Sequence, residues 1–204
     1  MTRLTKTLLA LGLINGALHA QTAVSGQALG VAVRTLATNL QSGQVTLPAG
    51  GGFVSADVDA LGAPEISVDA LTTMTSGMTD VQASTAQSTA HLENVNVLNG
   101  LITAETVIAA TSSWVSGPAG RNALGSSFTN LRVNGVPLGS GDYLPAPNTR
   151  VDLPGVGYAV LNEQVASGAS GIAVNMIHVV LRDALTGLTT GEIIVASASS
   201  SVGN

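Results

Sequence analysis

The clearest pattern in the sequence is a pair of apolar, partly alternating segments on either side of Asn99-Gly100, within residues 91–110. Asn-Gly accepts positive φ at both central positions of a tight turn, so it predicts a two-residue β-hairpin. That loop places Val97 opposite Ile102. Because apolar residues fall on both faces near the turn, we expect the hairpin to be covered on both sides, inside a sandwich.

Alternation of apolar and polar residues predicts further strands along the chain. The Ser/Thr/Ala-rich tract 72–90 fits a long polar strand or a short helix that starts at Asp80, and we favour the strand. A second Asn-Gly turn, at Asn134-Gly135, is followed by Pro137, which predicts an edge strand because proline donates no ladder hydrogen bond. The predicted strands are 24–36, 53–60, 66–73, 111–114, 128–133, 136–140, 150–153, 156–163, 171–182 and 190–198.

Roughly ten short strands separated by Gly, Pro and Asn turns are typical of an all-β protein. We therefore predict an antiparallel β-sandwich or jelly-roll. A parallel β-helix is the alternative, although the sequence has no fixed repeat period.

The N-terminal residues MTRLTKTLLALGLINGALHA have the layout of a secretory signal peptide: Arg3 and Lys6, a short apolar run, then small residues. We expect cleavage after Ala20 and one β-rich domain over residues 21–204. A membrane anchor needs roughly 20 apolar residues, and this run is far shorter, so no stable transmembrane anchor is predicted. The expected location is extracellular or at the cell surface.

Charge changes the picture of possible partners. After loss of the leader, five arginines and no lysine oppose twelve acidic residues, which leaves a net charge of −7. Because phosphate binding needs clustered cations and these arginines are scattered singly, we expect no nucleic-acid partner. Charged residues make up only 9% of the chain and there is no cysteine, so we expect a neutral-polar surface and a fold without disulfides.

Five segments, read in order, carry a family resemblance: NVNVLNGLITAETV, LRVNGVPL, PNTRVDLPGVGYAVLNEQ, VNMIHVVL and GEIIVASAS. Over residues 24–199 the chain resembles the choice-of-anchor P proteins of bacterial cell surfaces. The resemblance implies export and a β-rich surface domain, without an assigned activity. The chain departs from the group in ending SASSSVGN, so we expect a released or assembled protein.

Three residues are weak candidates for chemistry. Glu105 faces Asn94 in the first hairpin, and we expect a buried carboxylate that a neighbouring polar side chain satisfies. His178 shares a predicted face with Val174 and Met176, which favours a hydrogen-bonded core or boundary histidine over a catalytic or metal-binding one.

Other motifs are weaker or absent. Four acids, Asp57, Asp59, Glu65 and Asp69, could supply oxygens to calcium, but a solvated acidic face is favoured. The sequence has no GxSxG, SxxK, HExxH, GxGxxG or P-loop pattern. Trp114 and Tyr143 flank loops and fit boundary packing. We predict no catalytic residues, no metal site and no cofactor.

These observations together predict a secreted, non-enzymatic structural or interaction module whose partners are its own copies or components of the envelope or matrix. Two alternatives remain open. One is an adhesin-like module that binds glycan or calcium at its loop ends, and the other is a filament subunit assembled by strand donation.

Overall fold

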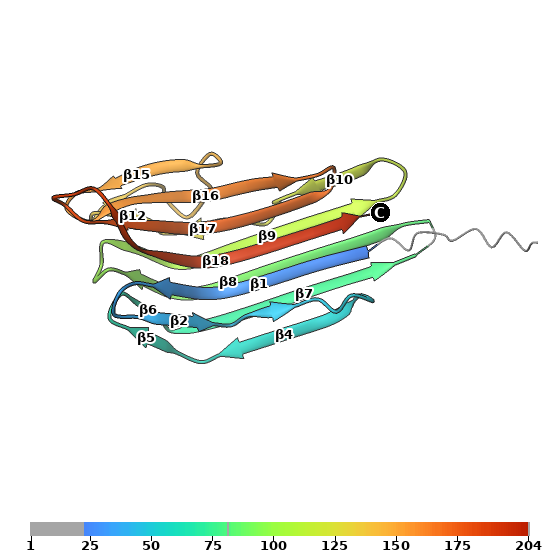
Figure 1. Cartoon of the computed structure of the whole chain (residues 1–204), viewed down its shortest axis with the longest axis horizontal. Coiled ribbons are helices and arrows are strands. Elements are labelled where there is room, and N and C mark those ends of the chain that lie inside the picture. The colour runs from blue at the N-terminus through green and yellow to red at the C-terminus, as the bar shows by residue number, and fades with distance from the viewer. Residues whose placement is uncertain (1–22, 81, 204) are drawn as a thin grey trace, which may run out of the picture.

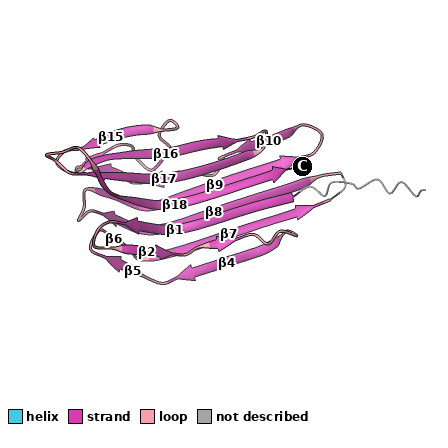
Figure 2. Ribbon diagram, in the orientation of Figure 1, coloured by secondary structure: helices cyan, strands magenta, loops and turns pink. Residues whose placement is uncertain are grey.

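The computed structural model describes residues 23–80 and 82–203, so the predicted leader lies outside the described residues. All regular structure in these ranges is β-strand, and every strand pair is antiparallel (Figures 1 and 2). No helix in the described ranges is long and apolar enough to cross a membrane. The antiparallel all-β prediction is confirmed, and the parallel β-helix alternative is wrong.

The described strands form two sheets. Sheet A has seven strands in the order β15-β16-β17-β18-β1-β2, with β3 also paired to β1. Their bounds are β1 (Ala23–Arg34), β2 (Asn39–Ser42), β3 (Val45–Thr46), β15 (Thr149–Leu153), β16 (Gly157–Ser167), β17 (Gly171–Arg182) and β18 (Thr189–Gly203).

Sheet B has eleven strands, and its centre is the long hairpin of β8 and β9. On the β8 side it is extended by β7 and β4 and by the short strands β6 and β5, and on the β9 side by the short strands β10 to β14. Its strands are β4 (Gly52–Val58), β5 (Leu61–Ala63), β6 (Ile66–Val68), β7 (Ala70–Thr79), β8 (Ser84–Val97), β9 (Ile102–Val115), β10 (Ala119–Asn122), β11 (Ser127–Thr129), β12 (Arg132–Val133), β13 (Val136–Pro137) and β14 (Asp142–Tyr143).

The two sheets pack face to face and enclose a core that changes along the strands. Near the β8–β9 turn the core holds large side chains, such as Ile102, Phe128 and Ile177. Toward the other end it holds small ones, such as Ala86, Ser88 and Ser200. Cα atoms of β18 approach those of β8 and β9 within 8 Å, closer than the ~10 Å usual for stacked sheets. Small side chains permit this approach.

Buried hydroxyl groups bond to one another where the sheets are close. Ser113 on sheet B meets Ser200 on sheet A with 2.8 Å between their oxygens. Gly26 lies so close to sheet B that a Cβ there would come within 2.2 Å of the Thr75 hydroxyl oxygen and 2.9 Å of that of Ser88. The Ser/Thr/Ala tract of the sequence therefore contributes small side chains to a thin interior: Thr75 and Ser88 bond to each other within sheet B at 2.9 Å, and Ser113 bonds to Ser200 across the layers.

Sheet A bends along a transverse line that crosses four neighbouring strands. On each strand two consecutive residues point into the core, and the pairing resumes beyond them in the same register. Two residues of the line have left-handed backbone, with φ of 50° at Asn162 and 52° at Ala196. We call this line the sheet A crease; its residues are Gly30, Asn162, Met176 and Ala196.

Sheet B has a corresponding line, the sheet B crease, at Asn94, Glu105 and Asn130. Here consecutive residues, such as Glu105 and Thr106, point outward instead of inward. Asn94 and Asn130 have φ of 51° and 54°. Because of this switch of faces, Leu92 on one side of the crease and Val95 and Val97 on the turn side all point into the same core.

The predicted hairpin is confirmed, with Asn99 and Gly100 at positive φ and Val97 paired with Ile102. Its expected cover on both sides is wrong, because the sheet B crease removes the need for it: Val97 and Ile102 are buried on one face while Asn96 is exposed on the other. Strict alternation cannot represent a change of face within a strand.

Other predicted elements are confirmed with adjusted bounds. The described residues of tract 72–90 lie mostly in β7 and β8, which pair as an antiparallel hairpin. The predicted strands 66–73 and 128–133 are each split at the sheet B crease, into β6 and β7 and into β11 and β12. β13, with Pro137, is an edge strand that pairs only with β12.

The sheet A crease gives a stability prediction at Asn162, which is fully buried and donates through Nδ2 to the Pro145 carbonyl at 2.8 Å. Asn162→Ala should lower the free energy of unfolding by about 3 kcal/mol, because alanine tolerates left-handed backbone poorly and the carbonyl loses its donor. Asn162→Gly should cost about 1–2 kcal/mol, since glycine keeps the left-handed backbone and loses only the side-chain hydrogen bonds to the Pro145 carbonyl and from Gln164 Nε2. Urea unfolding of both variants measures this, and an equal or larger loss for glycine would contradict it.

Candidate functional site

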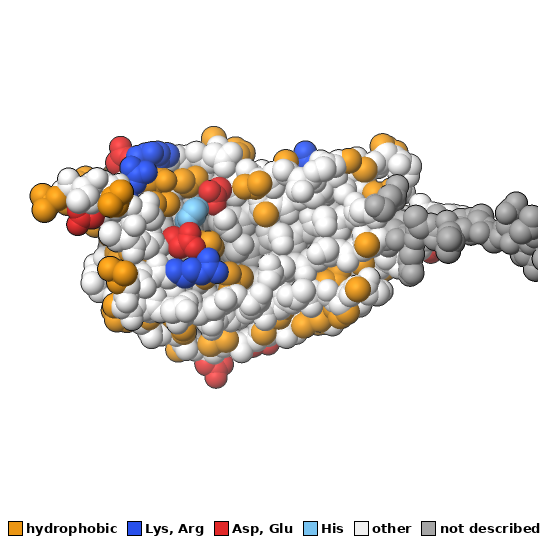
Figure 3. Space-filling model, viewed as in Figure 1, with side chains coloured by type: hydrophobic (Ala, Val, Ile, Leu, Met, Phe, Trp, Pro, Cys, Tyr) orange, Lys and Arg blue, Asp and Glu red, His pale blue; other side chains and the backbone are white. Residues whose placement is uncertain are grey.

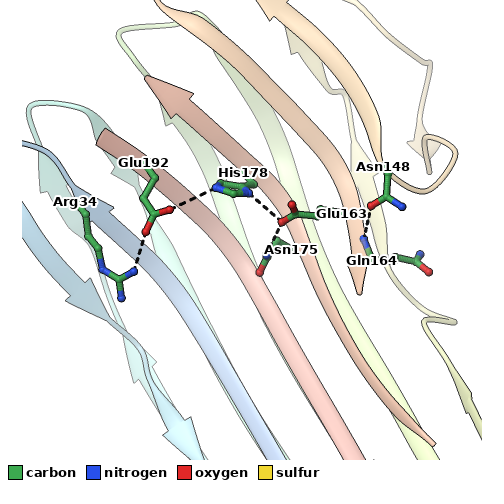
Figure 4. Close-up of polar contacts among 7 residues, drawn as sticks. All are labelled: Arg34, Asn148, Glu163, Gln164, Asn175, His178 and Glu192. Atoms are coloured by element: carbon green, nitrogen blue, oxygen red, sulfur yellow. Dashed lines mark hydrogen bonds and ion pairs between the residues drawn. The ribbon is translucent and has the colours of Figure 1, made fainter. Parts of the chain in front are cut away.

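The outer face of sheet A carries a connected row of polar side chains across β16, β17, β18 and β1 (Figure 4). Glu163 accepts hydrogen bonds from Asn175 Nδ2 at 2.7 Å and lies 3.0 Å from His178 Nδ1. On the other side of the ring, His178 Nε2 is 3.6 Å from Glu192 Oε2. Arg34 donates to Glu192 Oε1 at 2.8 Å. We call these five residues the sheet A polar row.

The sheet A crease is the reason that Glu163 and His178 meet. Glu163 pairs with Asn175, three positions before His178 on β17. In a strictly alternating strand, Asn175 and His178 would lie on opposite faces. Because Met176 and Ile177 both point inward, the outward face resumes at His178.

The imidazole of His178 is the most enclosed part of the row. The side chains of His178 and Glu163 are 19% and 23% exposed, whereas that of Arg34 is 61% exposed. His178 Nε2 is shielded from solvent and has no hydrogen-bond partner among the described residues, since 3.6 Å to Glu192 is an ion-pair distance and too long for a hydrogen bond. The ring therefore lies between two carboxylates on different strands, hydrogen-bonded to Glu163 and 3.6 Å from Glu192.

Tyr158 forms a second cluster on the same face. The Arg150 guanidinium lies 3.9 Å from the ring centroid and that of Arg182 lies 5.0 Å from it. Arg150 also forms an ion pair with Asp152 at 3.1 Å, with both side chains largely exposed. Figure 3 shows the charged groups of this face gathered at one end of the strands, whereas the other end is largely neutral.

Glu105 and Asn94 lie on the outer face of sheet B, along its crease. Glu105 is exposed and accepts from Asn130 Nδ2 at 2.5 Å. Asn94 donates to Asp69 at 2.9 Å. The prediction of a buried Glu105 is therefore wrong, and its partner is Asn130, which the hairpin pattern did not indicate. Asn130, between β11 and β12, thus satisfies a carboxylate that is also open to solvent.

His178 and Glu105 do not converge, because they lie on the outer faces of different sheets. The predicted face of His178 is half right: it is a boundary histidine, but Val174 and Met176 point into the core on the other side of the crease. Sequence reasoning missed Glu163 and Glu192. Both lie on predicted strands, and no spacing in the sequence reveals that they flank the same ring.

The acids considered for calcium are not gathered. Asp57 accepts from Thr72 at 2.7 Å, Asp69 binds Asn94, and Glu65 accepts from Thr38 at 2.9 Å. Over residues 23–80 and 82–203, no three His, Cys, Asp or Glu side chains form a group suited to a metal ion. Each of these three acids is instead bonded to a neighbouring side chain.

Trp114 and Tyr143 pack at the boundary over glycines. A Cβ at Gly120 would come within 2.3 Å of the Trp114 ring, and one at Gly139 within 2.5 Å of the Tyr143 ring. An aromatic ring over a strand glycine covers backbone that lacks a side chain of its own. Both aromatics therefore have a packing role in the structure.

Two open hollows lie at the ends of the strands. The larger, about 490 Å³, lies among the β9–β10 turn, the β16–β17 turn and the end of β18, and its polar lining includes Ser167, Ser170 and Ser201. The smaller, about 300 Å³, lies at the other end, between the β15–β16 turn and the β17–β18 loop.

Asp183 organises the β17–β18 loop. Its Oδ1 accepts from the backbone N–H and the hydroxyl of Thr186, each at 2.8 Å, and from the Leu185 N–H at 3.1 Å. These bonds favour the charged form and hold the pKa of Asp183 below its ordinary value of 3.8, with the Thr186 N–H as the largest cause. The loop so formed presents Leu185 and Leu188 to solvent, 96% and 68% exposed.

The family described as Domain of unknown function (DUF8256) matches residues 19–141. The chain belongs to the DUF8256 family. No match was found among the curated proteins or among the solved structures.

The DUF8256 match covers β1 to β13 and ends before β14 to β18. It therefore includes most of sheet B but only the β1, β2 and β3 margin of sheet A. Of the sheet A polar row, only Arg34 lies in the DUF8256 region. Asn94 and Glu105 lie inside it.

Glu163 and Glu105 form a matched pair for a stability test, because each accepts a hydrogen bond from an asparagine of a neighbouring segment: Asn175 on β17 and Asn130 between β11 and β12. Glu163→Ala should lower the free energy of unfolding by about 2 kcal/mol, since it leaves Asn175 and an enclosed imidazole unpartnered. Glu105→Ala should change it by less than about 0.5 kcal/mol, because water replaces the exposed partner. Chemical denaturation compares the two, and equal losses would contradict a special position for the sheet A polar row.

The β17–β18 loop gives a pH prediction. Because the folded pKa of Asp183 is lowered, its contribution to loop order is fully present above 3.8 and is lost as the pH falls through the folded pKa. Thr186→Val removes the hydroxyl donor and should raise the pKa of Asp183 toward 3.8. Carboxyl carbon NMR titration of both proteins measures this, and an unchanged Asp183 titration in the variant would contradict the role of the hydroxyl.

Proposed function

We propose that this DUF8256 protein is an exported, non-enzymatic structural or interaction module of the cell surface or extracellular matrix. The observation that carries the proposal is the way carboxylates are used on both outer faces. Each of five carboxylates bonds to a side chain of a neighbouring strand or of the segment beside that strand: Asp57, Asp69, Glu105, Glu163 and Glu192. Such cross-strand ties brace a sheet, which suits a scaffold that presents its faces to partners.

Export is supported by the N-terminal sequence, with its basic residues, apolar run and small residues before Gln21. The resemblance to choice-of-anchor P proteins agrees with this location. A cysteine-free domain has no thiols that would oxidise outside the cell and no disulfides to stabilise it, and here a core that extends along both sheets provides the stability.

A ligand-binding role is the second candidate. The hollow of about 490 Å³ at the strand ends favours it, because serines and backbone groups in its lining could bind sugar hydroxyls. Glycan arrays and calorimetry with calcium test this role, and binding lost on Ser201→Leu in the hollow would support it over the scaffold.

Export itself is tested by expressing the full sequence in a bacterial host, separating the cell fractions and measuring the mass of the recovered chain by mass spectrometry. We expect a chain that begins at Gln21, recovered outside the cytoplasm. Leu11→Arg should abolish processing because a charge interrupts the apolar run, whereas Leu11→Val should leave it intact. Recovery of an unprocessed cytoplasmic chain with wild-type sequence would contradict the proposed location.

A further inference from the structure

Each sheet ends in a strand that is paired on one side only. β15 of sheet A pairs with β16, and β4 of sheet B pairs with β7; no other described strand pairs with either. The two strands lie along opposite long margins of the molecule (Figure 1). An unpaired strand edge presents backbone N–H and C=O groups that can receive a further strand.

β4 is the less protected of the two edges. It has seven residues, GFVSADV, and none of them is lysine, arginine or proline. Basic residues and proline are among the features that block edge pairing in soluble proteins. Other strands at sheet margins are shorter: four residues in β2, three in β5 and two in β13.

Apolar groups along β4 are only partly covered. Val54, Ala56 and Val58 face inward but are half-buried, and Phe53 on the outer side is 65% exposed. Figure 3 shows hydrophobic side chains in a row along the lower margin, where β4 lies in Figure 1. A strand added here would bury apolar area on both faces.

The β15 edge complements the β4 edge in pattern and in charge. β15 has Val151 facing inward and half-buried, with Arg150 and Asp152 facing outward and exposed. An antiparallel register that sets Arg150 opposite Asp57 also sets Val151 opposite Ala56, so inward residues meet inward ones. Arg150 lies 3.9 Å from the Tyr158 ring centroid and forms an ion pair with exposed Asp152 at 3.1 Å. That ion pair is a weak surface pair that can be exchanged.

We propose that β15 of one copy pairs antiparallel with β4 of the next, with Thr149–Leu153 against residues 54–58, and that repetition of this contact builds a filament. The bonds formed are backbone hydrogen bonds between the two edges, together with the Arg150–Asp57 ion pair.

The topology fits this contact. β4 and β15 run in the same direction within one molecule, as the chain of antiparallel pairings and Figure 1 show. Antiparallel joining therefore requires each copy to be rotated by 180° about the axis that joins its two margins. The same rotation exchanges the layers, so sheet A of one copy continues sheet B of the next with their outer faces on the same side. The contact joins two different surfaces, which produces an open chain of copies.

This assembly deepens the proposed structural role by naming the partner as a second copy. Its test uses purified protein and is independent of export, so failure of one does not imply failure of the other.

Cysteine pairing tests the contact directly, because the sequence contains no cysteine. In the proposed register Ser55 faces Asp152 of the next copy, at a Cα separation that suits a disulfide. The double variant Ser55→Cys with Asp152→Cys, expressed from the full sequence and oxidised, should give a ladder of covalent multimers on a non-reducing gel. Paired cysteines at Ser112 and Ser199, in the middle of the two outer faces, measure random collision and should give no ladder.

Each single variant identifies a competing contact. A covalent dimer from Ser55→Cys alone would show β4 paired with its own copy, and one from Asp152→Cys alone would show β15 doing so; either result overturns the proposal. Absence of a ladder from the double variant, with the protein folded by circular dichroism, also overturns it.

Exchange of the two charges is the second test of the contact. Asp57→Arg or Arg150→Asp alone should weaken association about fivefold in analytical ultracentrifugation, because attraction becomes repulsion across the strands. The double exchange should restore wild-type association. Failure of the double variant to recover would overturn the register. Fibres seen by electron microscopy in the wild type and the double exchange, and reduced in either single variant, are the expected result.

Discussion

Two lines of backbone bend, the sheet A and sheet B creases, set the arrangement of the rest of this protein. At each line, neighbouring strands change the face that their side chains occupy without a shift in register. Left-handed residues such as Asn162 and Asn94 make the change possible, because asparagine tolerates this backbone better than most residues. One strand cannot change face alone beside strands that do not, so the residues of a crease act together.

The creases explain features that lie far apart in the chain. They allow the β8–β9 hairpin, apolar on both faces by strict alternation, to turn all its apolar side chains into one core. They bring Glu163 and His178 onto one outer face, and they set Glu105 beside Asn130 on the other. The polar contacts of both outer faces thus depend on the same backbone constraint as the core.

The DUF8256 match and the fold have different limits. The match ends at residue 141, yet β1 inside it pairs along its length with β18, which lies beyond. Sheet A is completed by β15 to β18, and these strands supply the inner face on which sheet B packs. The structural unit is therefore larger than the matched region, and it includes both the sheet A polar row and the β15 edge.

The sequence by itself determined the fold class, both Asn-Gly hairpins, the edge position of Pro137 and most strands, because turn chemistry and period-2 alternation act over a few residues. Only the tertiary structure decided which face each residue occupies beyond a crease. Glu105 was expected in the core and is exposed, and the carboxylates that flank His178 were not found. A change of face is set by several strands bending together, and no local pattern in one strand records what its neighbours do.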